Sequence, residues 1–311
     1  MKKVRAVFMG TPDFAVPCLA KLMEYAEVVG VVTQPDKPRG RGQKLTPSPV
    51  KAFAVENGLT VYQPAKVKTP EFVEVLKGLA PELIIVVAFG QILSQEILDI
   101  PAYGCINVHA SLLPRYRGCA PIQWAVINGE KKSGVTTMFM DAGLDTGDML
   151  LKSEVEITPE MSAAELFDVL MNEGAAALGR TIEQILAGTI VREKQPEGVS
   201  EYAPMLTKEL GHIDWQQGAQ KIHDLIRGLD SWPGAYTFLE GEKYKIWSSR
   251  VADCDLTGKP GEFLGTSANG FYVATGDGVL EIVEIQAPNK KRMAAADYLR
   301  GHAFGAKVCF E

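Results

Sequence analysis

The chain has 311 residues, of which 46% are hydrophobic and 23% are charged, and its net charge at pH 7 is −6. This length is too great for one small core and fits two domains of roughly 100 to 200 residues each. No apolar run approaches the ~18 residues that a membrane-spanning helix needs, which argues against a membrane protein.

The start of the chain and the cysteines bear on where the protein works. The stretch MKKVRAVFM is basic and then apolar, but it ends at Gly10 without a small-residue cleavage site, so we expect a first strand and no signal peptide. The five cysteines are scattered and form no C-x-x-C pair, which argues against a disulfide framework and against a cysteine zinc site. We therefore expect a reducing, cytoplasmic environment.

From residue 1 to about 190, short β-rich runs alternate with longer helical patterns. The runs are almost continuously apolar, as strands of a parallel sheet covered on both faces should be. We predict strands at 4–9, 27–32, 83–89, 105–110 and 134–140. We predict helices near 13–25, 48–57, 69–80, 92–99, 120–128 and 161–187. This alternation predicts an α/β domain with a Rossmann-like, doubly wound and mostly parallel sheet.

The rest of the chain has a different pattern. Residues 190–207 show no sustained periodicity and are predicted to form a linker. A predicted helix at 216–229 is followed by short strands separated by glycines, which is typical of a small antiparallel, OB-like β-barrel. The predicted organisation is a first domain at 1–189, the linker at 190–207 and a barrel domain at 208–311.

The first predicted strand leads into the turn GTPDF. A dinucleotide-binding oxidoreductase would carry G-x-G-x-x-G here, because its glycines let the backbone approach a pyrophosphate. This turn supplies Gly10 and lacks the rest of that motif, so NAD binding is not expected. A plain tight turn, with Asp13 capping the next helix, accounts for these residues.

Polar residues follow two of the predicted strands. Asn107 and His109 lie at the end of one, and side chains two apart on a strand share a face. Their N–H groups together suit a developing negative charge on oxygen, at the edge where α/β sheets bind ligands. Asp145 or Asp148, in the loop DAGLDTGD, could turn back toward His109, orient its ring and favour its protonated form.

From the residues alone, other interpretations of this cluster stay open. An Asn-x-His pair at a strand end often only satisfies the polar groups of a loop. A serine hydrolase would need a nucleophile such as Ser111, but this residue lies in a proline loop without G-x-S-x-G. A metal site would need a second histidine at ligand spacing, which this part of the sequence lacks.

The acidic chain carries one strongly basic stretch. Residues 34–51, QPDKPRGRGQKLTPSPVK, contain five basic residues against Asp36 alone, a local charge of +4. Their four prolines and two glycines predict an extended loop without regular structure. By itself the pattern is typical of a solvated loop, although it also suits attraction to phosphates. A smaller basic cluster lies at Lys290, Lys291 and Arg292.

Together these segments resemble a known family. INVHASLLPRYRGCAPIQWAVINGE, followed by GVTTMFMDAGLDTGDML, resembles the formyltransferase domain that uses 10-formyltetrahydrofolate, and the pairing of N-x-H-x-S-L-L-P with a downstream D-T-G is highly specific. The segments GTPDFAVPCL and TQPDKPRGRGQKLTPSPVK and the C-terminal barrel extend the resemblance over nearly the whole chain. They make it most similar to the family members that act on tRNA.

The resemblance implies the catalytic residues, which are Asn107, His109 and Asp145, and it implies no metal. It implies a folate-contacting loop, formed by Ser111, Leu112, Leu113 and Pro114. It implies that the basic stretch binds tRNA through Lys37, Arg39, Arg41 and Lys44. The implied reaction moves a formyl group from 10-formyltetrahydrofolate to the α-amine of methionine on initiator methionyl-tRNA, for translation initiation. The implied enzyme is a cytoplasmic monomer whose C-terminal barrel also binds tRNA.

Two alternatives differ in substrate or in activity. A formyltransferase that acts on an amino-sugar nucleotide would keep the same three catalytic residues but would not need the basic stretch. A tRNA-binding protein without enzymatic activity would have no need to retain all three catalytic residue types. An assay with charged initiator tRNA and with a sugar nucleotide separates the first alternative from the implied reaction.

Overall fold

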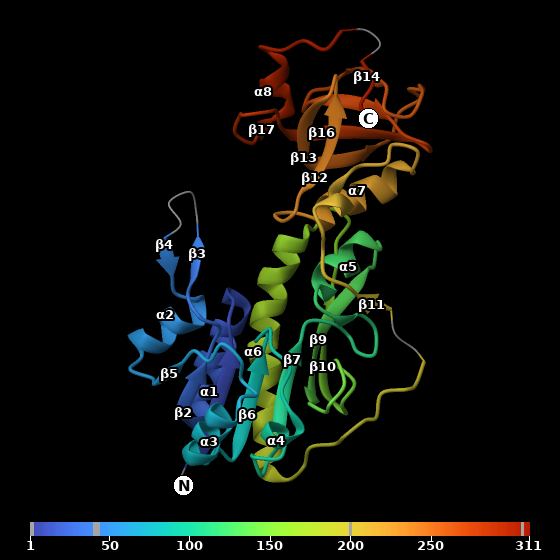
Figure 1. The fold of residues 1–311 in the computed structure, drawn as a ribbon. Coiled ribbons are helices and arrows are strands. Elements are labelled where there is room, and N and C mark those ends of the chain that lie inside the picture. Colours follow the sequence, from blue (N-terminus) through green and yellow to red (C-terminus); the bar gives the residue numbers. More distant parts are fainter. Residues whose placement is uncertain (1–2, 40–43, 199–200, 306–307) are drawn as a thin grey trace. The chain divides into compact units, whose positions relative to one another are not determined.

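The computed structural model describes residues 3–39, 44–198, 201–305 and 308–311. The chain forms two compact units (Figure 1). The first consists of Met1–Gly118, Gly134–Val155 and Phe167–Tyr202, and the second of Cys119–Ser133, Glu156–Leu166 and Ala203–Glu311. The sequence predicts one domain boundary after residue 189 and another after residue 207, so that each predicted domain is a single continuous segment. These boundaries stay a prediction.

The first unit is built on a seven-stranded sheet with the strand order β10-β9-β7-β6-β1-β2-β5. Its strands are β1 (Val4–Gly10), β2 (Ala26–Val32), β5 (Val61–Tyr62), β6 (Leu83–Val87), β7 (Cys105–His109), β9 (Lys132–Phe139) and β10 (Met149–Glu156). Strands β5, β2, β1, β6 and β7 pair in parallel, whereas β9 runs antiparallel to β7. The predicted Rossmann-like, mostly parallel sheet is therefore confirmed.

Helices cover both faces of this sheet (Figure 1). They are α1 (Val16–Tyr25), preceded by the 3-10 turn η1 (Asp13–Ala15), α2 (Pro49–Glu56), α3 (Pro70–Leu79), α4 (Gln95–Leu98) and α6 (Ala163–Ala187). Buried side chains of α3 and α4 pack in one cluster with alternate residues of β1, β6 and β7. On the opposite face, Gly174 of α6 lies against Val108 of β7. The predicted helices of this region are confirmed to within a few residues.

The basic stretch differs from its prediction. Strand β3 (Lys37–Arg39) pairs antiparallel with β4 (Lys44–Thr46), so the expectation of an extended loop without regular structure is wrong. The residues between the two strands, 40–43, lie outside the described residues, and Arg41 is among them. Two short segments separated in the sequence by a few residues that include glycine are the sequence pattern of a β-hairpin, and proline is tolerated at the edge of such a ribbon.

The second unit contains a sheet of six antiparallel strands. They are β12 (Ala235–Leu239), β13 (Glu242–Ala252), β14 (Phe263–Thr266), β15 (Phe271–Ala274), β16 (Val279–Gln286) and β17 (Met293–Ala294). The other elements of this unit and its borders are α5 (Pro121–Ile127), β8 (Arg117–Gly118), β11 (Tyr202–Ala203), η2 (Glu209–Gly211), α7 (Ala219–Gly228) and α8 (Ala295–Leu299). Helix α5 packs closely on α7. A Cβ at Gly228 of α7 would lie 2.5 Å from the Ile127 side chain of α5, so glycine permits this close approach.

The last residues of the chain close this sheet into the predicted barrel. Phe238 of β12 and Glu311 exchange two backbone hydrogen bonds, of 2.9 and 2.8 Å. On the other side, the Phe310 N–H donates to the Gly261 carbonyl over 2.8 Å, just before β14. The Phe263 N–H of β14 also donates to the Val308 carbonyl over 2.9 Å, so the segment 308–311 bridges β12 and β14, the two ends of the main strand order.

We expect Phe310→Ala to lower the free energy of unfolding of the second unit by about 3 kcal/mol, which is typical for truncation of a buried aromatic side chain. Phe310 is 3% exposed and its ring stacks on Phe271, with the ring centroids 5.7 Å apart. Denaturant unfolding followed by tryptophan fluorescence measures this, because all four tryptophans belong to the second unit. Cys309→Ala changes the exposed neighbour and is the control; an equal loss in both variants would contradict the prediction.

Candidate active site

Asn107 and His109 lie at the carboxyl end of β7, a buried strand in the parallel part of the sheet. The two side chains are two residues apart and so share a face of the strand. Both are buried, with exposed fractions of 8% and 6%. Buried polar side chains need hydrogen-bonding partners, and a single loop supplies a partner to both Asn107 and His109.

That loop follows β9 and carries Asp145. One carboxylate oxygen, Oδ2, lies 3.6 Å from Nδ1 of His109, and the other, Oδ1, accepts a hydrogen bond of 3.4 Å from Nδ2 of Asn107. Oδ2 also accepts from the backbone N–H of Gly118 over 2.9 Å. The three side chains expected to be catalytic are thus brought together. Of the two aspartates considered from the sequence, Asp145 is the one that faces His109.

The His109 ring is held on its second side as well. Its Nε2 lies 2.9 Å from the carbonyl oxygen of Tyr116, a residue with a left-handed backbone (φ 58°). A carbonyl oxygen only accepts, so Nε2 carries a hydrogen in this arrangement. Nδ1 faces the Asp145 carboxylate, which can accept a second hydrogen from a protonated ring. The two contacts fix the plane and the direction of the imidazole.

The loop expected to contact folate uses two of its four residues to hold its own shape. The Ser111 hydroxyl donates to the Arg115 carbonyl over 2.7 Å, and the Leu113 N–H donates to the Thr136 hydroxyl over 3.0 Å. Leu113 is buried in a cluster with two methionines. Leu112 and Pro114 are half-buried and leave part of their apolar surface accessible.

The sequence analysis missed Gln195, which contacts the backbone of the Asp145 loop. Its Nε2 donates to the carbonyls of Asp145 and Gly147, both over 2.8 Å. Its Oε1 accepts from Nε of Arg117 over 2.9 Å. Gln195 lies in the stretch expected to be a linker, and nothing in its local pattern signals a contact with residues about fifty positions earlier.

Charge in the basic stretch is concentrated in the β3–β4 hairpin. Lys51, in α2, forms an ion pair of 2.6 Å with Asp36, and this pair, with a hydrogen bond from Gln63, holds the pKa of the Asp36 carboxyl below its usual value. Of the four residues expected to bind tRNA, Lys37 and Arg39 belong to β3, Lys44 begins β4, and Arg41 lies outside the described residues. Lys37 is exposed.

The hairpin begins five residues after the end of β2. Strand β2 is parallel to β1, β6 and β7, so its carboxyl end lies at the same edge of the sheet as Asn107 and His109. This topology places the basic hairpin at the edge that carries the candidate active site.

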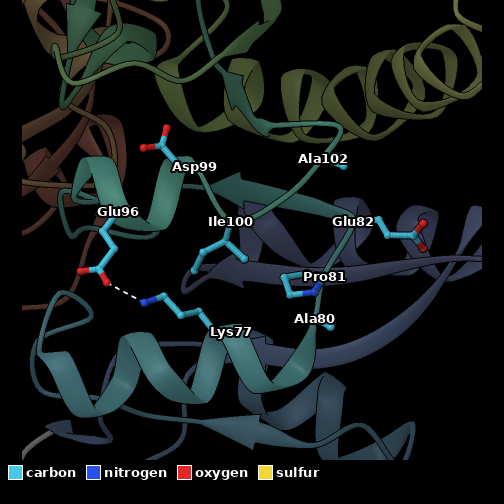
Figure 2. A pocket seen from close by; sticks show the side chains of 8 residues that line it. All are labelled: Lys77, Ala80, Pro81, Glu82, Glu96, Asp99, Ile100 and Ala102. Atoms are coloured by element: carbon cyan, nitrogen blue, oxygen red, sulfur yellow. Dashed lines mark hydrogen bonds and ion pairs between the residues drawn. The ribbon is translucent and has the colours of Figure 1, made fainter.

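A surface cavity of about 570 Å³ lies elsewhere in the first unit (Figure 2). It is lined by residues before β6 and before β7, at the amino ends of these strands, and by the Lys77–Glu96 ion pair of 2.8 Å. Glu82, Glu96 and Asp99 give it an acidic wall, which disfavours an anionic ligand. The cavity is therefore separate from the site at the carboxyl edge.

The described part of the chain holds neither a metal-binding cluster nor a membrane-spanning helix. Among residues 3–39, 44–198, 201–305 and 308–311, no group of three or more His, Cys, Asp or Glu side chains is arranged to hold a metal ion. Over the same ranges, no helix has the length and apolarity needed to cross a membrane.

Two family models match the chain. Residues 2–182 match the model described as "Formyl transferase", and residues 205–303 match "Formyl transferase, C-terminal domain". Two relatives named methionyl-tRNA formyltransferase are each 53% identical to this chain. The one from Clostridioides difficile (strain 630) aligns over 300 residues, 96% of this chain and 97% of the relative. The one from Geobacter sulfurreducens aligns over 302 residues, 97% of this chain and 95% of the relative.

Solved structures share the fold at lower identity. WlaRD, a sugar 3N-formyl transferase, has a TM-score of 0.68 at 23% identity and covers 94% of this chain and 100% of its own. HypX from Aquifex aeolicus, solved in complex with tetrahydrofolic acid, has a TM-score of 0.64 at 20% identity, over 98% of this chain and 48% of its own. The structural likeness supports the fold, and the sequence matches decide the family. This chain belongs to the methionyl-tRNA formyltransferases of the formyl transferase family.

Proposed function

We propose that this chain transfers the formyl group of 10-formyltetrahydrofolate to the α-amino group of methionine on initiator methionyl-tRNA, for translation initiation. The observation that carries this is the convergence of Asn107, His109 and Asp145 at the carboxyl edge of the sheet. The 53% identity to methionyl-tRNA formyltransferases over nearly the whole chain supports the choice of acceptor. The enzyme works in the cytoplasm as a monomer.

Asn107 and His109 stabilise the charge that develops during transfer. When the amine attacks the formyl carbon, a C–N bond forms and the formyl oxygen becomes negative. The second amide hydrogen of Asn107 and a ring N–H of protonated His109 donate to this oxygen. Because the Tyr116 carbonyl already accepts from Nε2 of His109, the formyl oxygen competes with it for that hydrogen.

Asp145 serves the proton transfers of the same step. Its carboxylate contacts both Asn107 and His109, which holds their side chains in place, and accepts a proton from the attacking nitrogen, directly or through a water molecule. The bond between the formyl carbon and N10 of the folate then breaks, and N10 takes up a proton. The products are formylmethionyl-tRNA and tetrahydrofolate.

The loop after β7 and the β3–β4 hairpin hold the two substrates. Leu112 and Pro114 offer half-buried apolar surface to the folate, while Ser111 and Leu113 keep the loop in shape. The hairpin contacts phosphates of the acceptor stem, which supplies affinity that depends on salt. The C-terminal barrel provides a further tRNA-binding surface.

The decisive experiment measures formyl transfer from 10-formyltetrahydrofolate to charged initiator tRNA and, in parallel, to an amino-sugar nucleotide. Transfer to the tRNA alone is the expected result, and transfer to the sugar nucleotide alone would replace the proposed acceptor. Asn107→Ala should bind tRNA normally and lose turnover. If neither acceptor is formylated by the wild-type chain while tRNA still binds, the chain is a binding protein.

We expect Lys37→Ala to weaken tRNA binding and to flatten its salt dependence by roughly one unit of log-log slope, as loss of one phosphate contact does. Lys77→Ala is the matched control, because it removes the same charge from the amino edge of the sheet, where Lys77 pairs with Glu74 and Glu96. Binding titrations at several salt concentrations measure both variants. Folate affinity should stay constant, and equal slopes for both variants would show that the hairpin makes no phosphate contact through Lys37.

A further inference from the structure

Residues 192–195, which we call the strap, are fixed to the first unit although their sequence is typical of a linker. The N–H and the carbonyl of Glu193 pair with Met149 at the start of β10, over 2.9 and 2.8 Å. The Arg192 guanidinium lies over the ring of Phe139, 3.8 Å from its centroid. These contacts flank the loop that carries Asp145, since Phe139 ends β9 and Met149 begins β10.

Gln195, at the end of the strap, has each side of its amide engaged. Nε2 has two hydrogens, and it donates to two carbonyls, those of Asp145 and Gly147, at 2.8 Å each. Oε1 accepts from Arg117 at 2.9 Å. Only a side chain with a donor and an acceptor at this length joins all three groups.

These contacts form a closed ring around Asp145. Arg117 precedes Gly118, whose backbone N–H donates to Oδ2 of Asp145. Gln195 therefore binds the backbone of Asp145, and Gly118 binds its carboxylate. The hydrogen bond between Arg117 and Gln195 connects these two contacts. The backbone and the carboxylate of Asp145 are thus both held by residues outside the loop that carries it.

The backbone of the Asp145 loop needs such support. Asp145 has φ 53°, a left-handed conformation that is uncommon for residues other than glycine and persists where surrounding contacts determine it. Gly147 lies so close to β9 that a Cβ there would be 1.8 Å from the Phe139 carbonyl oxygen. The turn is thus fixed at Gly147 by close packing and at Asp145 by hydrogen bonds.

We propose that Gln195 is a positioning residue, which sets the Asp145 carboxylate against His109 by holding the backbone of its loop and coupling it to Arg117. This rests on the proposed function, in which Asp145 acts in formyl transfer. Gln195 itself touches no reacting atom, because its amide is occupied by protein groups. Gln195 therefore affects the rate of formyl transfer within the bound complex. It does not affect the affinity for either substrate.

The test compares Gln195→Leu, which keeps the size and removes all three hydrogen bonds, with wild type. We expect kcat to fall by about 10- to 100-fold, as misplacement of a catalytic group by about 1 Å does, with both KM values within about twofold. Gln195→Glu places a carboxylate against two carbonyls and should lower kcat by a similar factor. It is the second test variant if Gln195→Leu does not fold. Val191→Ala, which changes a 74% exposed side chain nearby, is the control with unchanged kcat.

A double-mutant cycle with Asp145→Asn separates positioning from a purely structural role. If Gln195 acts through Asp145, Gln195→Leu causes little further loss of kcat in the Asp145→Asn background. Full additivity, or a wild-type kcat for both Gln195 variants, overturns the inference while the proposed function stands. Normal turnover in Asp145→Asn itself overturns the proposed mechanism instead.

Discussion

His109→Ala should lower kcat for formyl transfer by about 10²- to 10³-fold, the cost typical of removing one donor to an oxyanion. The ring lies between the Tyr116 carbonyl and the Asp145 carboxylate, and alanine leaves no donor at this position. Single-turnover assays with saturating folate and charged tRNA measure the chemical step. Affinity for both substrates should stay close to that of wild type, because the ring is 6% exposed and offers little contact surface.

His302→Ala is the control for this variant, because His302 is an exposed residue of the second unit whose ring stacks on Tyr298. It should leave kcat unchanged. If His109→Ala keeps more than about half of the wild-type rate, the imidazole has no part in the transfer. The oxyanion would then depend on Asn107 and on backbone donors.

Asp145→Asn should reduce kcat by a similar factor, because an amide cannot take the proton of the attacking nitrogen. The variant keeps the size of the side chain and can still accept from the Gly118 N–H. The loss is therefore one of charge and basicity. Single-turnover assays with saturating folate and charged tRNA, at one fixed pH, measure the loss.

Asp148→Asn is the matched control in the same loop. The backbone carbonyl of Asp148 accepts from the Phe139 N–H over 2.9 Å, a contact that the substitution leaves in place. We expect nearly wild-type turnover. An active Asp145→Asn beside an inactive Asp148→Asn would exchange the roles of the two aspartates.

The sequence predicts most of the first unit because its central strands are buried on both faces. All five residues of β6 and of β7 are buried, and such runs stand out as continuously apolar segments. The edge strands gave no such signal. β5 is two residues long, and β10 alternates between half-buried and exposed residues, in the sequence MLLKSEVE. A pattern of this kind resembles a polar loop more than a core strand.

The candidate site could be predicted as far as its residues lie at strand ends or in a specific motif. Asn107 and His109 are two apart on β7, so their proximity follows from strand geometry alone. Asp145 required the family motif to be preferred over Asp148. Gln195 could not be found, because its contacts with Asp145 and Gly147 depend on the path of a segment without local periodicity.

The close packing of α5 on α7 bears on how this protein can be dissected. A fragment that ends at residue 189, as the sequence boundaries suggest, would contain α5 but lack α7. In the intact chain, Ala120 shares an apolar cluster with Leu206 and Leu229, and Trp124 and Ile127 of α5 pack against it. Truncation would expose this surface and favour aggregation of the fragment. During synthesis, about a hundred residues follow α5 before α7, its packing partner, is made. The second unit therefore completes its folding late in synthesis.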